Sequence, residues 1–309
     1  MRTAVIVNTN AGRFRRRPGL IERARALAGR DADCFATSSL AELDRAAEAL
    51  AGREPDRVVL AGGDGTFMAG LSALARVYSS GALPVIVLAP AGTAGTVPRG
   101  LGQRGGFERP LRRATAPAPL GWVERPTISV SDSNGARRVG FIFGTGLVAR
   151  FFDHYEAAGA GGYLVAARIA ARVFVGALTG GAFARSVLEP LPCRLSVDGA
   201  LCAPCAWSLI VSSTIRDLGL HFVVTHRGGE DPARPHLVAS PLGPRALGVQ
   251  LGRVLTGRPL TGAGNVDALV SRFELDFPDG PGPYILDGDL FSAARVTVEA
   301  GPRVRIARV

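Results

Sequence analysis

A glycine-rich turn with a single carboxylate is the segment of this sequence best suited to chemistry. The run Gly62-Gly63-Asp64-Gly65-Thr66 directly follows an apolar stretch. Glycines let a ligand approach the backbone closely, and a helix that begins after the turn offers N–H groups to a phosphate oxygen. A phosphate would repel Asp64 unless a cation lay between them, which implies Mg²⁺. The alternative is an ordinary strand–turn–helix corner, capped by Asp64 or Thr66.

Two further polar, glycine-containing loops follow predicted strands. They are Asn-Thr-Asn-Ala-Gly at 8–12 and Pro-Ala-Gly-Thr-Ala-Gly-Thr at 90–96. In an open parallel sheet, the carboxyl ends of the strands form the ligand crevice. Three such loops at one sheet edge favour a cradle for a phosphorylated ligand over an isolated corner.

A second pair of carboxylates, Asp287 and Asp289, lies near the C-terminus within the stretch 283–291. If this strand stays extended, the two side chains project to the same side. Such a pair could bind Mg²⁺ or take a proton from an attacking hydroxyl. Asp-Gly is also a favoured pair for a type I′ hairpin, so an ordinary turn is the alternative.

The basic residues are all arginines. The chain has 309 residues, a formal charge of +10 and a pI near 10.7, and it contains no lysine. This excludes the phosphate loop that ends in Gly-Lys-Ser/Thr and excludes catalysis by lysine. Any phosphate must therefore be held by backbone N–H groups, arginines or a metal.

The basic charge also limits the class of partner. Four arginines follow the first predicted strand and form either a clamp for nucleotide phosphates or anionic lipid, or a solvated loop: Arg13, Arg15, Arg16 and Arg17. A basic surface suits a phosphorylated molecule or an anionic membrane. Aromatic residues make up only 6% and no nucleic-acid motif is present, so we expect no nucleic-acid partner.

Cysteine and histidine carry little predicted chemistry. Cys202 and Cys205 form a lone C-x-x-C without the second pair that a zinc site needs. We therefore expect reduced thiols, as is typical of cytosolic proteins. The four histidines are scattered and are expected to be ordinary surface or internally bonded residues: His154, His221, His226 and His236.

The N-terminal 120 residues alternate between predicted strands and helices. Strands are predicted at 3–8, 32–36, 56–63 and 83–90, and helices at 18–30, 39–52 and 66–78. This β-α-β-α-β order predicts a parallel sheet covered by helices. The chain opens on a strand, and it has no apolar run of the roughly 18–20 residues that a membrane span needs. These features lead us to expect a cytoplasmic protein.

The predicted secondary structure changes after the proline- and alanine-rich connector at 114–121. Short, partly alternating strands are predicted at 125–132, 138–146, 193–199, 206–214, 220–227, 272–277, 283–291 and 295–309. They predict a mainly antiparallel β-sandwich. One apolar helix interrupts them at 162–180, with Arg168 and Arg172 on one face; a core helix is favoured over an interfacial one.

Taken together, four motifs resemble the diacylglycerol kinase catalytic family. They are VIVNTNAG, GGDGT, PAGTAGTVPRGLG and, near the C-terminus, LDGD. That family includes bacterial lipid kinases and sphingosine kinases and is related to the NAD kinases. The resemblance implies a nucleotide-binding α/β domain at 1–120, a lipid-substrate β-sandwich domain at 121–309, and an active site in the cleft between them.

The resemblance also implies particular site residues by position. Together with Arg13 from the basic loop, the expected nucleotide-binding residues are Asn8, Gly12, Thr37, Gly62, Gly63, Asp64, Gly65, Thr66, Gly92 and Thr93. The expected catalytic and metal-binding residues are Asp64, Asp287 and Asp289. The implied cofactors are ATP and Mg²⁺.

This chain departs from the family pattern at four places. Thr9 stands where the family has Pro, Met68-Ala69 where it often has Asn-Glu, and Gly95-Thr96 where it has Asn-Asp. Asp289 replaces the Glu of Asp-Gly-Glu, which shortens the side chain by one methylene, about 1.5 Å.

The predicted function is an ATP- and Mg²⁺-dependent lipid kinase. It would transfer the γ-phosphoryl group to a hydroxyl of diacylglycerol, a sphingoid base or a related lipid alcohol. Its expected partners are this lipid and an anionic membrane surface, with peripheral attachment at the inner face of the membrane; a homodimer is left open. Two alternatives are a lipid- or nucleotide-binding relative with weakened catalysis, and a soluble-substrate kinase of the NAD kinase type.

Overall fold

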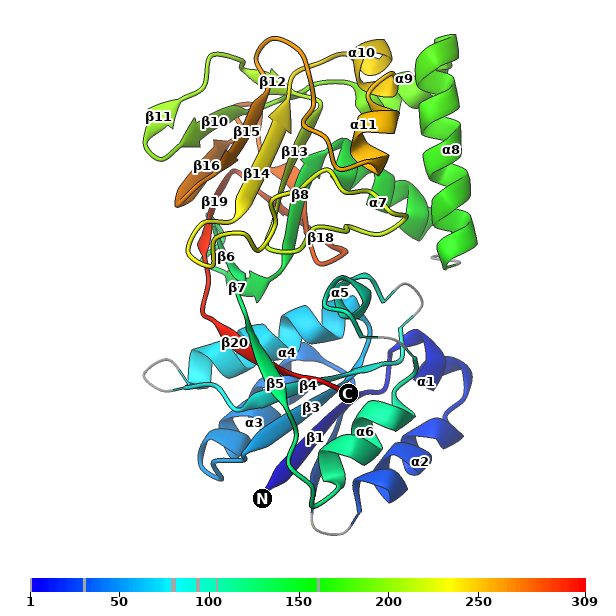
Figure 1. Cartoon of the computed structure of the whole chain (residues 1–309), viewed down its shortest axis with the longest axis vertical. Coiled ribbons are helices and arrows are strands. Elements are labelled where there is room, and N and C mark those ends of the chain that lie inside the picture. Colours follow the sequence, from blue (N-terminus) through cyan, green and yellow to red (C-terminus); the bar gives the residue numbers. More distant parts are fainter. Residues whose placement is uncertain (1, 30–31, 79–81, 93–94, 104, 160–161) are drawn as a thin grey trace. The chain divides into compact units, whose positions relative to one another are not determined.

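The computed structural model in Figure 1 describes residues 2–29, 32–78, 82–92, 95–103, 105–159 and 162–309. The chain forms two compact units. The first comprises Met1–Arg125 with Pro302–Val309, and the second comprises Pro126–Gly301. The C-terminal segment thus returns to the first unit, a return that the sequence pattern does not reveal.

The first unit is an α/β layer built on one six-stranded sheet. Its strands are β1 (Thr3–Asn8), β2 (Asp33–Thr37), β3 (Arg57–Gly62), β4 (Val85–Pro90), β5 (Trp122–Arg125) and β20 (Val304–Ala307). Its helices are α1 (Gly12–Arg16), α2 (Gly19–Ala28), α3 (Leu40–Ala51), α4 (Asp64–Val77), α5 (Thr96–Gly100) and α6 (Glu108–Thr115).

The strand order β2-β1-β3-β4-β20-β5 brings the glycine loops to one edge of this sheet. The strands β2, β1, β3 and β4 are parallel neighbours, with Val5 opposite Val59 and Leu60 opposite Leu88. Parallel neighbours end at the same sheet edge, so the loops after β1, β3 and β4 emerge together. The last strand, β20, pairs in parallel with β4 and antiparallel with β5.

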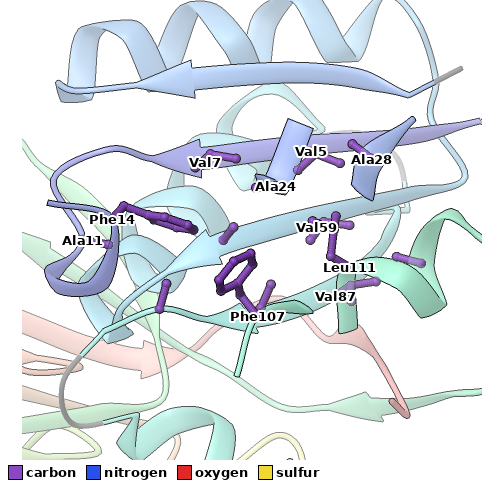
Figure 2. Close-up of a cluster of buried hydrophobic side chains, with 14 of the residues drawn as sticks. Val5, Val7, Ala11, Phe14, Ala24, Ala28, Val59, Val87, Phe107 and Leu111 are labelled. Carbon is purple, nitrogen blue, oxygen red and sulfur yellow. The ribbon is translucent and has the colours of Figure 1, made fainter. Parts of the chain in front are cut away.

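The apolar runs of the strands are buried on both faces of this sheet, as parallel strands usually are. Figure 2 shows the cluster on the face covered by α1, α2 and α6. Phe14 and Phe107 meet edge to face in it, with ring centroids 5.1 Å apart. On the other face, α3 packs against α4. Ser39 caps α3 by accepting the Glu42 N–H at 3.2 Å, which fixes the helix start that the sequence predicts.

The second unit is a mainly antiparallel β structure with two six-stranded sheets. The first sheet has the order β11-β10-β16-β19-β6-β7 and contains β6 (Ile128–Asp132), β7 (Arg137–Gly140), β10 (Arg194–Val197), β11 (Ala200–Leu201), β16 (Arg272–Asp276) and β19 (Arg295–Ala300). The second has the order β15-β14-β13-β8-β17-β18 and contains β8 (Ile142–Gly146), β13 (Leu209–Ser213), β14 (His236–Ser240), β15 (Val266–Leu269), β17 (Gly282–Leu286) and β18 (Asp289–Ala293). A short pair, β9 (Leu191–Pro192) and β12 (Ala206–Trp207), completes the strands of the described residues.

The two sheets of this unit pack face to face. The rings of Phe143 on β8 and Phe273 on β16 lie 5.6 Å apart, centroid to centroid. The Tyr284 hydroxyl on β17 donates to the Asp132 carboxylate on β6 at 2.6 Å. The predicted fold class, a parallel α/β domain followed by an antiparallel sandwich, is confirmed.

Helices cover the other face of the second sheet. They are α7 (Leu147–Ala157), α8 (Tyr163–Thr179), α9 (Ala182–Leu188), α10 (Pro244–Gly248) and α11 (Leu251–Leu255). Val173 and Leu247 on these helices share one apolar cluster with Leu209 and Val238 on the strands. The predicted strand at 220–227 is wrong, because this stretch forms turns between β13 and β14.

Among the described residues, no single helix is long and apolar enough to cross a membrane. Taken together, α8 and α9 have the length and composition of a membrane span, but the pair is bent by 104° at the break between the two helices.

Candidate functional site

The glycine turns after β3 and β4 touch through their backbones. Ala91 and Gly92 donate their N–H groups to the Gly62 carbonyl, at 2.7 and 3.2 Å. A Cβ atom added to Gly92 would lie 2.6 Å from the Gly63 Cα, closer than side-chain carbons come to backbone in proteins. The glycines at these two positions therefore permit a close backbone approach.

Thr66 ties the glycine turn to the end of β1. Its hydroxyl oxygen accepts hydrogen bonds from the Asn8 side-chain amide at 2.8 Å and from the Gly63 N–H at 3.2 Å. A Cβ on Gly62 would overlap with the Thr66 side chain. The Asn8 side-chain oxygen in turn accepts the Asn10 N–H at 2.9 Å. The predicted residues Asn8, Gly62, Gly63 and Thr66 thus lie together at one sheet edge.

Asp64 links the glycine turn to the start of α5. Its carboxylate accepts the Thr96 N–H at 2.8 Å and the Val97 N–H at 3.1 Å. Burial raises the pKa of the Asp64 carboxyl to about 6, although these hydrogen bonds and the charge of Arg99 act in the opposite direction. The Gly95 N–H also bonds to this carboxylate. At neutral pH Asp64 is mostly ionised and keeps lone-pair capacity beyond these backbone bonds.

The N-terminus of α4 supplies the anion-binding potential of this edge. The helix is 14 residues long and begins at Asp64, directly after the extended Gly63. Its first N–H groups, including that of Gly65, have no carbonyl partner within the helix, and its dipole favours negative charge there. This geometry suits a phosphate oxygen.

The loop after β1 brings arginines to the same part of the first unit. Gly12 begins α1, and the Arg13 N–H donates to the Ala91 carbonyl at 3.0 Å, which joins this loop to the one after β4. The Arg13 guanidinium lies beside Gly106, where a Cβ would come within 2.7 Å of it. Among the described residues, Arg13, Arg15 and Arg16 form no ion pair with an acidic group.

Of the two predicted site residues Thr37 and Thr93, the structure describes only Thr37. Thr37 ends β2 and is buried; its carbonyl accepts the Thr9 N–H at 2.9 Å. Thr37 therefore lies at this sheet edge, but its observed hydrogen bond joins β2 to the residue that follows β1. Thr93 lies outside the described residues.

Asp287 and Asp289 flank the turn of a hairpin in the second unit. Leu286 pairs with Asp289, and the two loop residues Asp287 and Gly288 have φ angles of 49° and 95°. This is the type I′ pattern. The extended arrangement, in which both carboxylates project from one strand, is therefore wrong; the turn separates them.

The Asp287 carboxylate is turned onto the backbone of the neighbouring strands. Its Oδ1 accepts the N–H groups of Phe141 at 2.9 Å and Ile142 at 2.8 Å, and its Oδ2 lies 3.2 Å from the Phe141 nitrogen. Only 3% of Asp287 is exposed. Asp289, at the start of β18, is half-buried. Asp287 thus holds the hairpin, and Asp289 is the carboxylate with access to solvent.

A buried polar network that the sequence analysis did not identify supports the same hairpin. Asp132 accepts from the Tyr284 hydroxyl at 2.6 Å and pairs with Arg138 at 2.7 Å. The Arg138 guanidinium lies 4.0 Å from the centre of the Phe291 ring. Asp132 and Arg138 are on β6 and β7 of the first sheet, so the face-to-face packing of the two sheets brings them to β17 and β18 of the second.

Comparison with known proteins agrees with these motifs. Residues 2–118 match the family model of the diacylglycerol kinase catalytic domain. A search of curated proteins gave no match. The resemblance indicated by GGDGT and its companion loops is thus confirmed for the segment that carries them.

Solved structures are similar over the whole chain. A diacylglycerol kinase from Bacillus anthracis str. Sterne is 14% identical, with a TM-score of 0.63. Two putative diacylglycerol kinases from the same strain are 14% and 15% identical, with TM-scores of 0.67 and 0.68. Each comparison covers 100% of this chain and 97% of the other. At this identity the likeness shows the fold, and the family match supports a kinase of the lipid-kinase type.

Proposed function

We propose that this protein is an ATP- and Mg²⁺-dependent lipid kinase that phosphorylates a lipid hydroxyl. The observation that carries the proposal is the contact between Gly63 and Gly92 beside the N-terminus of α4, within the segment that matches the catalytic-domain model. Acceptors of the diacylglycerol or sphingoid class fit a family of lipid kinases, and we do not assign one among them.

We assign nucleotide binding to the first unit. A lysine-free chain must hold phosphates through backbone N–H groups and arginines. The N-terminus of α4 offers the former, and Arg13, Arg15 and Arg16 on α1 offer the latter. Arg13 is fixed by its backbone bond to Ala91, so one arginine of this group stands at the glycine loops.

The oxygen donors fit Mg²⁺, which prefers one or two carboxylates together with substrate phosphates. Asp64 keeps lone-pair capacity beside the backbone N–H groups of Gly95, Thr96 and Val97, so it can contribute one ligand. Bound Mg²⁺ would supply charge neutralisation of the transferred phosphoryl group. Asp287 does not fit a metal ligand, because it is buried and its carboxylate is used by Phe141 and Ile142.

We assign proton removal from the acceptor hydroxyl to Asp289. It is the more accessible carboxylate of the hairpin, and its shorter side chain requires accurate placement. The backbone bonds of Asp287 and the Asp132–Tyr284 bond hold the hairpin that carries it. Asp287 is thus a positioning residue in this proposal.

The sequence pattern favours a core helix at 162–180, but the exposure of its apolar residues supports the interfacial alternative, and we further propose that α8 attaches the protein peripherally to an anionic bilayer. Leu164, Val175 and Leu178 are 80%, 63% and 49% exposed and lie on one helical stripe. Val249 continues this apolar surface, since its neighbour Gly248 packs against Ala177 and lies beside Leu178. We call these four residues the apolar face.

The charges around the apolar face suit an anionic lipid surface. The segments 162–188 and 232–266, which contain α8 to α11, have no Asp or Glu. Arg168, Arg172 and Arg245 on these helices are exposed and form no ion pair among the described residues. Apolar side chains flanked by arginines are typical of interfacial helices. A cytoplasmic protein at the inner face of a membrane would meet such a surface.

Purified protein incubated with Mg²⁺ and ATP labelled in the γ-phosphate, against fractionated lipids and against NAD, tests the proposed activity. We expect label in an organic-soluble product from at least one lipid fraction. Label in NADP alone would instead support a soluble-substrate kinase. ATP binding by calorimetry without any labelled product would support the non-catalytic relative and contradict the proposal.

A further inference from the structure

Two histidines and an aspartate of the second unit, distant in sequence, form a compact cluster. One potential ligand atom from each of His226, His236 and Asp267 lies within 4.8 Å of the other two. All three side chains are mostly shielded from solvent: the exposed fractions are 15% for His226, 0% for His236 and 21% for Asp267. Neither the motifs nor the proposed kinase chemistry uses them.

The pairing of two strands brings two of these residues together. His236 is opposite Leu269 and Asp267 is opposite Val238, so the two are diagonal neighbours on one face of the β14–β15 pair. The His236 Nε2 and Asp267 Oδ1 atoms are 2.8 Å apart. Their proximity is therefore fixed by the register of the sheet.

His226 comes from the turn segment between β13 and β14. Its ring is nearly perpendicular to that of His236, at 80°, with the centroids 4.8 Å apart. Its Nε2 lies 3.9 Å from Asp267 Oδ1. Its Nδ1 lies 3.4 Å from the Val224 carbonyl, which favours a proton on Nδ1 and leaves the Nε2 lone pair directed toward the cluster. This is the orientation usual for a metal-binding histidine.

One carboxylate oxygen of Asp267 has no hydrogen-bond partner in this arrangement of the described residues. Its Oδ2 is buried and has no hydrogen-bond partner among the described residues. Burial favours the protonated form, but the hydrogen bond from His236 and the charge of Arg227 keep the pKa of Asp267 below its ordinary value. A buried carboxylate oxygen without a partner is costly, and a cation would satisfy it.

We propose that His226, His236 and Asp267 bind one divalent transition-metal ion of the zinc class. Two imidazoles and one carboxylate suit Zn²⁺ and similar ions, whereas Mg²⁺ and Ca²⁺ prefer oxygen donors. The ion would tie the turn segment between β13 and β14 to β14 and β15. The site is independent of the kinase proposal and is not part of its metal requirement.

Binding requires a specific proton shift at His236. In the metal-free arrangement, the Arg227 N–H donates to His236 Nδ1 at 3.3 Å, so the ring proton is on Nε2 and faces Asp267. Coordination through Nε2 moves this proton to Nδ1, and the contact with Arg227 is lost. The tautomer change conserves the charge of the ring, so no net proton leaves His236.

The test is calorimetric titration of the chelator-treated full chain with ZnCl₂ and, separately, MgCl₂. Cys202→Ser and Cys205→Ser are present throughout, because this C-x-x-C is the competing zinc ligand. We expect one Zn²⁺ per chain and no comparable Mg²⁺ binding. His226→Gln and Asp267→Asn should each weaken zinc binding at least about tenfold. Gln and Asn are close in size to the side chains that they replace, so the variants lose little packing, and circular dichroism checks their folding.

His221→Asn serves as the matched control. His221 is exposed and has a φ of 62°, which Asn tolerates, so we expect unchanged zinc binding. Nitrogen NMR of the wild-type ring should show His236 changing from the Nε2–H to the Nδ1–H tautomer, with a shift of the Arg227 amide. The proposal would be overturned if zinc binding is absent, if it is as tight in the His226→Gln and Asp267→Asn variants as in their parent, or if it requires Cys202 and Cys205.

Discussion

The carboxylate of Asp64 accepts the backbone N–H of Thr96 at 2.8 Å, so the acidic residue of the glycine turn also fixes the start of α5. One side chain thereby connects the loops that follow β3 and β4. The same carboxylate holds the loop and is available to a cation. The ionisation of Asp64 therefore affects both the stability of the fold and cation binding.

The first prediction concerns the pH dependence of stability. The pKa of Asp64 is raised to about 6 in the folded protein, above its ordinary value of 3.8. Between these values the unfolded chain loses its proton while the folded chain retains it, so folding stability falls as pH rises. Below this window and above it, the Asp64 contribution is constant.

Denaturant unfolding of wild type and Asp64→Asn from pH 4 to pH 7.5 measures this contribution. The stability of wild type relative to the variant should decline from about pH 4 to about pH 6 and then level off. Carboxylates with lowered pKa values, such as Asp132 and Asp267, are present in both proteins and cancel in the difference. A difference that stays flat over this range would contradict the burial of Asp64.

The second prediction concerns the contact between the glycine loops. Gly92→Ala places a Cβ 2.6 Å from the Gly63 Cα and forces the two turns apart. We expect a loss of about 1–3 kcal/mol in unfolding free energy, together with weaker ATP binding. Gly52→Ala is the control, since a Cβ there meets no atom within 4 Å. Equal stability and ATP affinity in the two variants would exclude the close approach.

The third prediction separates the two hairpin aspartates. Asp287→Ala leaves the buried N–H groups of Phe141 and Ile142 without their acceptor and puts alanine at a φ of 49°. We expect it to lower the unfolding free energy by about 2–4 kcal/mol. Asp289→Asn should lower it by less than Asp287→Ala does, because Asp289 is half-buried and the amide keeps the shape of the carboxylate. Thermal and denaturant unfolding measure both, and the reverse order of effects would contradict the assigned roles.

The fourth prediction concerns the apolar face of α8. Leu164→Asp and Val175→Asp should reduce sedimentation with vesicles that contain anionic phospholipid, because each places a negative charge at the bilayer contact. Leu201→Asp is the control, as Leu201 is 68% exposed on β11, outside this face. Arg168→Gln with Arg172→Gln should weaken binding mainly at low salt. Equal sedimentation of the Leu164 and Leu201 variants would refute this membrane contact.

The sequence predicts the first unit well, because its pattern is local. The apolar runs and the Ser39 cap define β1, β3 and α3 to within a residue or two. Parallel strands then bring their C-terminal loops to one edge, so the meeting of Asn8 with Thr66 follows from topology. The pairing of β20 with β4 is different, since no local pattern shows which sheet a C-terminal strand joins.

The structure of the second unit is harder to predict from sequence, because its key contacts depend on the register of its strands. The stretch 220–227 alternates like a strand but forms turns, so tertiary context overrides its propensity. Asp287 and Asp289 look like a pair on one strand, yet the type I′ turn assigns them different roles. His236 and Asp267 are 31 positions apart and meet only through the β14–β15 ladder.

In the function proposed for this chain, the γ-phosphoryl group of ATP is transferred to a lipid hydroxyl with the aid of Asp289. The most direct measurement is the rate of labelled lipid formation by wild type, Asp289→Asn and Asp279→Asn under one set of conditions. Asp279 is an exposed residue of the same unit and serves as the matched control. We predict that Asp289→Asn loses at least about 100-fold in kcat while Asp279→Asn keeps the wild-type rate. Equal rates for Asp289→Asn and wild type, or no labelled lipid from wild type, would contradict the claim.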